Sequence, residues 1–138
     1  MQVKMVFTAL TGLFLFLGCN KTPTEKLDEM VSADGVLKFF GSFQGLGSEK
    51  VSGEAKIFLS NNNYMLKLEN FNTTNGPDLK VYLSKASTPQ SFISLGNLKS
   101  TNGNQVYEIP GTPDFLQYRF VLIHCERFNH LYGTAEIK

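Results

Sequence analysis

The chain has 138 residues, 13 Lys and Arg against 12 Asp and Glu, two cysteines and no tryptophan. This length is that of one ordinary domain with short flanking segments. The charges are balanced and no two cations are adjacent, so the sequence offers no basic patch for nucleic-acid phosphates or anionic lipid head groups. A nucleic-acid-binding function is therefore excluded.

The amino terminus is typical of a secretory leader. Lys4 precedes a charge-free stretch at 5–17, which suits a signal peptide but is shorter than the roughly 20 apolar residues that cross a bilayer. The small residue Gly18 stands before Cys19, and this pair resembles the lipobox of bacterial lipoproteins. We therefore predict a lipoprotein signal peptide at 1–18 and an acylated Cys19 that anchors the protein to a membrane, extracytoplasmic, in the bacterial cell envelope. A simple secreted protein and an uncleaved anchor are the alternatives.

The next segment, 19–33, is polar and is predicted as the lipidated N-terminus and a flexible tether. Leu27, Met30 and Val31 fall at helical spacing, so one or two turns of helix are the alternative. The domain itself is expected at 34–138.

Apolar residues in the domain recur with a period of two, which is typical of half-buried strands. Clusters of Asn, Gly, Pro, Thr and Asp separate these segments and predict tight turns. Strands are expected at 36–44, 51–59, 64–69, 79–83, 93–98, 105–109, 117–125 and 129–137. About eight short strands predict an all-β domain, a single antiparallel β-sandwich or flattened barrel. Its core is expected to contain Val51, Ala55, Ile57, Leu66, Leu68, Leu79, Val81, Leu83, Val121 and Ile123.

Seven sequence blocks across 38–138, taken in order and spacing, resemble the DM-thirteen domain. They include Val51-Ser52-Gly53-x-Ala55-x-Ile57, Asn75-Gly76-Pro77-Asp78-Leu79 and Tyr118-x-x-Val121-x-Ile123-x-Cys125. The resemblance implies a β-sandwich module with an electron-transfer role centred on the cysteine that corresponds to Cys125.

The chain departs from that family at two positions. Many members have histidine shortly before the Val-Ser-Gly block, where this chain has Glu49, and tryptophan before the cysteine, where it has His124. No cofactor is identifiable from the sequence, which leaves haem and copper open. Glu49 argues against haem, because a carboxylate suits a harder metal.

Cys125 is the only free thiol once Cys19 is acylated, and it ends the apolar run 118–125. It is either a redox centre, which needs a lowered pKa and access, or a small buried hydrophobe. His130 is the candidate neighbour for sharing a metal or tuning the thiol. A two-residue turn at 126–127 would place the two residues diagonally on one sheet face, about 7–8 Å apart. One additional loop residue would send their side chains to opposite faces.

These features predict a membrane-anchored lipoprotein with a thiol-centred redox or electron-transfer accessory domain that works beside a redox partner protein. A stand-alone enzyme is not expected, because the chain has no Gly-x-Ser-x-Gly, phosphate-loop, His-Glu-x-x-His or Cys-x-x-Cys motif. Asp78 is interpreted as a turn residue and not as a catalytic acid. The alternative is a structural or ligand-binding lipoprotein, for example one that binds carbohydrate through Phe58 and Tyr82 on the outward phase of their strands. The metal content and oligomeric state are not determined by the sequence.

Overall fold

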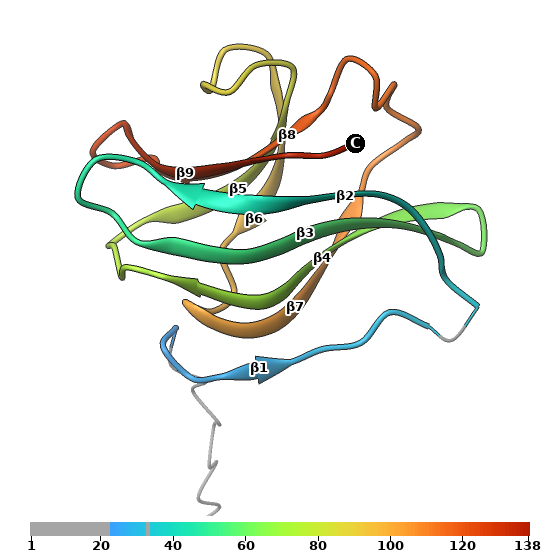
Figure 1. Ribbon diagram of the computed structural model, residues 1–138, viewed down its shortest axis with the longest axis horizontal. Coiled ribbons are helices and arrows are strands. Elements are labelled where there is room, and N and C mark those ends of the chain that lie inside the picture. The colour runs from blue at the N-terminus through green and yellow to red at the C-terminus, as the bar shows by residue number, and fades with distance from the viewer. Residues whose placement is uncertain (1–22, 33) are drawn as a thin grey trace, which may run out of the picture.

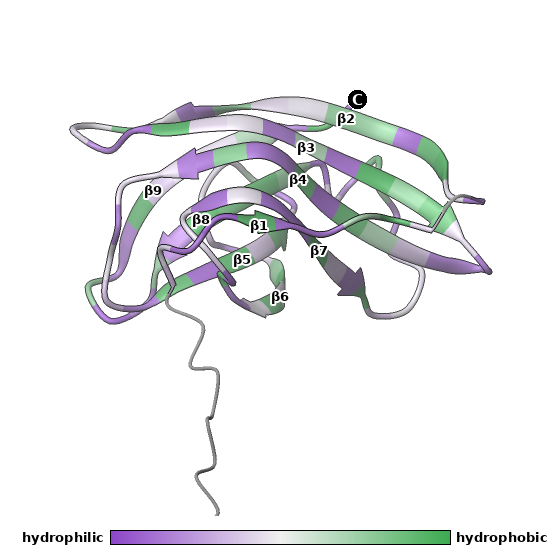
Figure 2. Cartoon of the chain, turned by 90° about the horizontal axis from the view of Figure 1, so that it is seen from below, coloured by the Kyte–Doolittle hydropathy of each residue, from purple (hydrophilic) through white to green (hydrophobic). Residues whose placement is uncertain are grey.

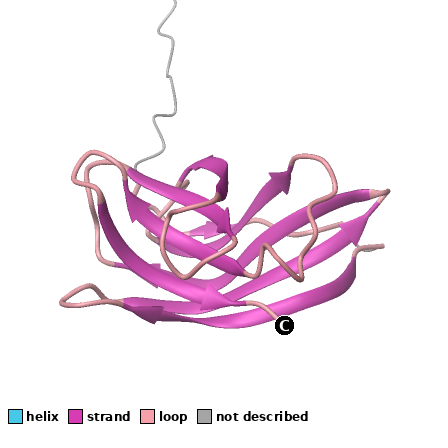
Figure 3. Ribbon diagram, turned by 90° about the horizontal axis from the view of Figure 1, so that it is seen from above, coloured by secondary structure: helices cyan, strands magenta, loops and turns pink. Residues whose placement is uncertain are grey.

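The period-two segments form strands throughout the part of the chain that the computed structural model describes, residues 23–32 and 34–138. This part contains strands and loops and no helix (Figure 3). All eight segments expected from the pattern are strands, and a short additional strand precedes them. The strands are β1 (Leu27–Asp28), β2 (Val36–Gly45), β3 (Val51–Ser60), β4 (Asn63–Thr73), β5 (Leu79–Ser84), β6 (Phe92–Asn97), β7 (Asn102–Ile109), β8 (Phe120–Cys125) and β9 (His130–Glu136).

The strands pair into one sheet in the order β1-β7-β4-β3-β2-β9-β8-β5-β6. Every pair is antiparallel except β1 with β7, which is parallel. The sheet curls so that β5 and β6 lie behind β2 and β3 (Figure 1), and the result is a flattened half-barrel. The all-β prediction is confirmed, and the flattened barrel is the form that the sheet takes.

The inside of the half-barrel is apolar because alternate side chains of each strand point into it. All ten side chains predicted for the core are buried. Aromatic rings complete it, with the Phe43 and Phe71 centroids 5.3 Å apart in an edge-to-face arrangement. Apolar and polar residues alternate in bands along β2, β3 and β4 (Figure 2), as the period-two pattern requires.

Residues 27–28, which belong to the segment predicted as a tether, pack against the sheet. Leu27 is buried and lies opposite Gly103 of β7. Gly103 has a φ of 102° and no space for a Cβ, because the Leu27 backbone lies against it. The helical alternative for this segment is wrong, since Leu27–Asp28 is extended. Cys19 and the signal peptide predicted at 1–18 lie outside the described residues, and no helix among those described is long and apolar enough to cross a membrane.

The connections lie alternately at the two ends of the half-barrel. One end, here called the Cys125 end, carries the loops 46–50, 74–78, 98–101 and 126–129. Backbone hydrogen bonds join these loops, from Thr74 N–H to Lys50 O (2.9 Å) and from Glu126 N–H to Asp78 O (3.0 Å). The opposite end carries the loops 61–62, 85–91 and 110–119.

Candidate functional site

Cys125 is the last residue of β8, and its side chain is 0% exposed. Its strand partners are Leu79 of β5 on one side and His130 of β9 on the other. The thiol is free and belongs to the apolar core cluster, together with Val81 and Ile123. Cys125 is therefore packed as a small hydrophobe in this conformation, directly inside the loops of the Cys125 end.

The loop that connects Cys125 to His130 has four residues, 126–129, and the two-residue turn considered from the sequence is wrong. Asn129, whose φ is 46°, completes the loop and donates its N–H to Glu126 O (3.2 Å). Asn tolerates this left-handed conformation better than most residues. A loop of even length keeps the expected parity, so Cys125 and His130 are paired directly instead of diagonally.

The His130 imidazole is directed to the loops and not to the thiol. Its Nε2 lies 3.3 Å from Glu49 Oε1, and its side chain is 52% exposed. Glu49 lies in the loop just before the Val51-Ser52-Gly53 block, and it holds the imidazole of His130. The ring of His130 also packs edge-to-face on Tyr132, with the centroids 5.3 Å apart.

Tyr132 contacts these residues, and no sequence motif marks it. A bulge between Ile123 and His124 of β8 makes Tyr132 the additional residue of β9, and its ring is buried. Burial raises the pKa of Tyr132, and the negative charges of Glu49 and of a Cys125 thiolate raise it further. Tyr132 therefore belongs to the same core cluster as Cys125 and contacts the ring of His130, which pairs with Glu49. Tyr132 could be recognised only from the register shift between β8 and β9, which the sequence does not show.

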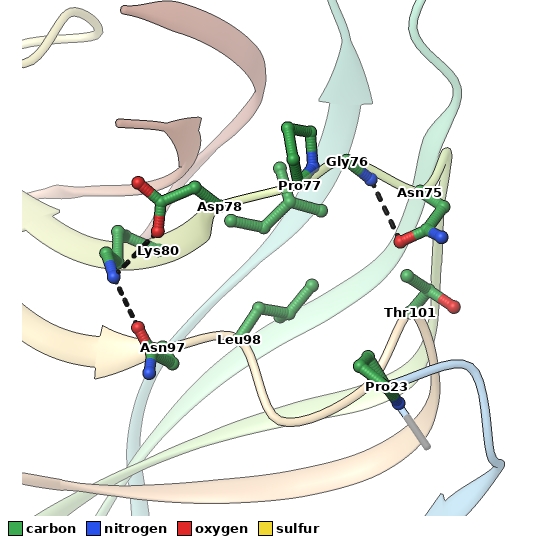
Figure 4. Close-up of a pocket in the computed structure, with 10 residues that line it drawn as sticks. Pro23, Asn75, Gly76, Pro77, Asp78, Lys80, Asn97, Leu98 and Thr101 are labelled. Carbon is green, nitrogen blue, oxygen red and sulfur yellow. Dashed lines mark hydrogen bonds and ion pairs between the residues drawn. The ribbon is translucent and has the colours of Figure 1, made fainter. Parts of the chain in front are cut away.

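A groove of about 270 Å³ opens at the same end (Figure 4). Pro23, Pro77, Leu79 and Leu98 supply its apolar wall, and the remaining lining residues are Asn75, Gly76, Asp78, Lys80, Asn97 and Thr101. Leu79 both lines the groove and pairs with Cys125, so one residue links the groove to the thiol.

The polar side of the groove is internally neutralised. Lys80 Nζ lies 2.9 Å from Asp78 Oδ1 and also donates to Asn97 Oδ1. The hydrogen bond from Lys80 lowers the pKa of Asp78, so this carboxylate is ionised and paired. Asn75 Oδ1 accepts the Gly76 N–H at 2.9 Å, which is the local bonding of a tight turn. The geometry agrees with the interpretation of Asp78 as a turn residue.

The chain matches one known protein family. The family model described as Electron transfer DM13 matches residues 42–137, which include β3 to β9 and Cys125. The chain belongs to the DM13 family. No significant match was found among the curated proteins or among the solved structures. The family description thus gives the DM13 domain of this chain an electron-transfer-related role. The resemblance to the DM-thirteen domain found in the sequence is confirmed.

On the outer face of the DM13 domain, His124 is buried one residue before the thiol. Its Nε2 lies 3.2 Å from Asn129 Oδ1, while its buried Nδ1 has no hydrogen-bond partner. Burial lowers the pKa of His124. Successive strand residues point to opposite faces, so His124 does not share the interior with Cys125.

Tyr82 is also buried on this outer face, and its prediction as an exposed aromatic is wrong. The ring of Phe92 stacks on Tyr82 with the centroids 4.0 Å apart, and the Tyr82 hydroxyl donates to Glu126 Oε2 at 3.2 Å. Burial, followed by the charge of Glu126, raises the pKa of Tyr82 to about 12. Phe58 is half-buried. The alternation along each strand correctly predicted that Phe58 and Tyr82 point to the outer face of the sheet. It could not show which side chains of a neighbouring strand cover them there.

The described residues near Cys125 do not form a ligand cluster for a copper ion. Over 23–32 and 34–138 there is no group of three or more His, Cys, Asp and Glu side chains that could hold a metal. His130, the strand partner of Cys125, is paired with Glu49 of the 46–50 loop. What the site offers is a buried thiol, a buried phenol and an exposed imidazole paired with a carboxylate.

Proposed function

We propose that this protein is an extracytoplasmic lipoprotein, held on a membrane by a lipid on Cys19, whose DM13 domain is a redox or electron-transfer accessory module centred on Cys125. The observation that carries the proposal is the electron-transfer family match over 42–137. Cys125 lies in this matched region and is the one cysteine of the described residues. The module is proposed to work beside a redox partner protein in the cell envelope.

Chemistry at the sulfur requires access, because a thiolate must reach its reaction partner. In the closed domain the thiol is covered by the loops of the Cys125 end, where Glu126 N–H bonds to Asp78 O (3.0 Å). Residues 126–130 are exposed to solvent. Short exposed loops open locally at a lower free energy than that of global unfolding. We therefore propose that Cys125 reacts through local opening of this end.

The complete burial of Cys125 favours a second candidate, a structural or ligand-binding lipoprotein in which the thiol only fills the core. The 0% exposure and the membership in the apolar cluster are what this candidate requires. A carbohydrate-binding face built on Tyr82 has little support, because the ring of Phe92 covers Tyr82.

The rate at which N-ethylmaleimide alkylates Cys125 discriminates between the two candidates. The full-length protein is labelled at urea concentrations below its unfolding transition, with Cys125→Ala as the unlabelled control. Local opening exposes little surface, so the redox proposal expects a rate almost independent of urea. A structural thiol reacts only after global unfolding, so its rate would rise with urea along the slope of the unfolding equilibrium. That result would refute the thiol-centred proposal.

The lipid anchor is tested separately by Cys19→Ser. This change removes the acylation site and leaves the described domain unaltered, so the variant is expected in the soluble fraction with an unchanged β-type circular dichroism spectrum. The acylated wild type should stay with the membrane, because several buried acyl chains hold a protein there stably. A Cys19→Ser variant that remained membrane-bound would contradict the anchor.

A further inference from the structure

We infer that the Cys125 end of the DM13 domain lies against the lipid bilayer, with Phe128 and Leu46 in the head-group region. This inference rests on the proposed lipid on Cys19. It adds the orientation of the domain and the surface through which it meets the membrane, neither of which follows from acylation alone.

The first observation is where the chain enters the domain. Pro23 accepts a hydrogen bond from Thr101 N–H (2.8 Å), and Thr101 O accepts one from Thr73 N–H (3.0 Å). Thr74 N–H then donates to Lys50 O (2.9 Å), which continues the connection across the loops of the Cys125 end. Pro23 also lines the groove at this end (Figure 4). The amino-terminal segment thus joins the domain at the end that carries the thiol.

The second observation is the short covalent path to the proposed lipid. Cys19 and Pro23 are four residues apart, and an extended chain covers at most about 3.6 Å per residue, which gives a reach of about 14 Å. This length is shorter than the domain, since the ten residues of β3 alone extend to roughly 30 Å at 3.3 Å per residue. An acyl anchor at Cys19 therefore keeps the Pro23 side of the domain close to the bilayer.

The third observation is the apolar character of two loop tips at this end. Phe128 is 68% exposed and Leu46 is 38% exposed. The 46–50 loop is held to β9, the strand that follows the Phe128 loop, because Leu46 N–H donates to Tyr132 O (2.9 Å) and His130 pairs with Glu49 at 3.3 Å. The two apolar side chains therefore lie on neighbouring loops of the same end.

Each apolar tip has an exposed cation beside it. Arg127 precedes Phe128 in the β8–β9 loop, and Lys50 lies in the same loop as Leu46. Apolar side chains at the acyl boundary with Lys or Arg beside them at the head groups are the arrangement of interfacial membrane segments. The balanced charge of the chain does not attract it to anionic membranes over long distances, so the lipid brings the domain to the surface and the tips orient it.

This orientation has a consequence for the proposed redox role. Cys125 lies directly inside the loop that carries Phe128, and the opening of that loop would expose the thiol towards the membrane surface. The redox partner is then a protein whose own site lies at the membrane plane, and not one that approaches from the far side of the envelope.

The absence of tryptophan from the chain provides the test. Two single-tryptophan proteins are prepared in the full acylated chain, Phe128→Trp at the Cys125 end and Leu116→Trp as the control. Leu116 is 80% exposed and lies in the loop 110–119 at the opposite end. Both are reconstituted on vesicles of phosphatidylethanolamine and phosphatidylglycerol that contain a brominated phosphatidylcholine, whose bromines quench nearby indole rings.

The Phe128→Trp protein is expected to show a blue-shifted emission maximum and a loss of emission on brominated vesicles, while Leu116→Trp keeps both unchanged. Flotation of the vesicles separates the possible failures. A protein that floats without quenching at position 128, or with quenching at 116 alone, overturns the orientation and leaves the anchor intact. A protein that does not float overturns the anchor, and the orientation with it.

Discussion

Replacing Cys125 by serine should destabilise the domain more than replacing it by alanine. The side chain is 0% exposed within an apolar cluster, where the sulfur acts as a small hydrophobe. Serine keeps most of the volume but buries a hydroxyl without an assured partner, which costs about 1–3 kcal/mol. Alanine loses about as much apolar material as one methylene group, which corresponds to about 0.8 kcal/mol before any cavity term. We therefore expect the order of stability to be wild type, then alanine, then serine.

Urea unfolding followed by far-ultraviolet circular dichroism measures this order, with the free energy of unfolding extrapolated linearly to water. Thermal unfolding supplies a second readout, because 1 kcal/mol shifts the Tm of a domain of this size by about 4–8 °C. A serine variant as stable as the wild type would refute the reasoning. It would mean that the hydroxyl finds water or a polar partner, which is the environment of an accessible thiol.

Three further predictions concern other parts of the domain. Gly103→Ala combines about 1–3 kcal/mol of backbone strain with a collision against Leu27, so limited proteolysis should release the amino-terminal segment. Gly111 also has a positive φ but has open space around it, so Gly111→Ala is the matched control for strain alone. This control should keep the segment protected. The lowered pKa of His124 means that the unfolded chain takes up a proton before the folded one, so stability should fall as the pH drops below about 6.5. In urea titrations at several pH values, His124→Gln should weaken this dependence. An unchanged dependence would show that His124 does not cause it. Tyr82, with its pKa raised from 10.0 to about 12, keeps its proton in the folded state after the unfolded chain has lost it. Stability should therefore decline between these pH values, and Tyr82→Phe should reduce the decline. Tyrosinate absorbance that rises at the ordinary pKa for all five tyrosines would argue against the burial of Tyr82.

The strand positions and the core were predictable from the sequence because both depend on local patterns. An alternating strand has one face that must be buried, so Ile57 and Leu66 are inward-facing whichever strand becomes their neighbour. The turn clusters are local in the same way, since Asn, Gly and Pro determine where the chain can reverse. The family resemblance used the same short blocks, with Cys125 at the end of one of them.

The tertiary structure decided which side chains meet around Cys125. A bulge after Ile123 adds Tyr132 to the core cluster that contains the thiol, and a four-residue loop pairs Cys125 directly with His130. The imidazole then binds Glu49, a residue from a loop more than 70 positions away in the sequence. Register shifts and contacts between distant loops arise from the packing of the whole sheet, and no local pattern encodes them.

The same distinction explains the remaining differences. The polar segment before the domain shows no alternation, so the pairing of Leu27 with Gly103 could not be predicted from its own residues. Tyr82 follows the outward phase of its strand, yet Phe92 of the next strand covers it. The sequence by itself therefore determined the strands, the core and the family. The curl of the sheet decided what covers the thiol, because burial depends on elements distant in the sequence that approach only when the sheet curls.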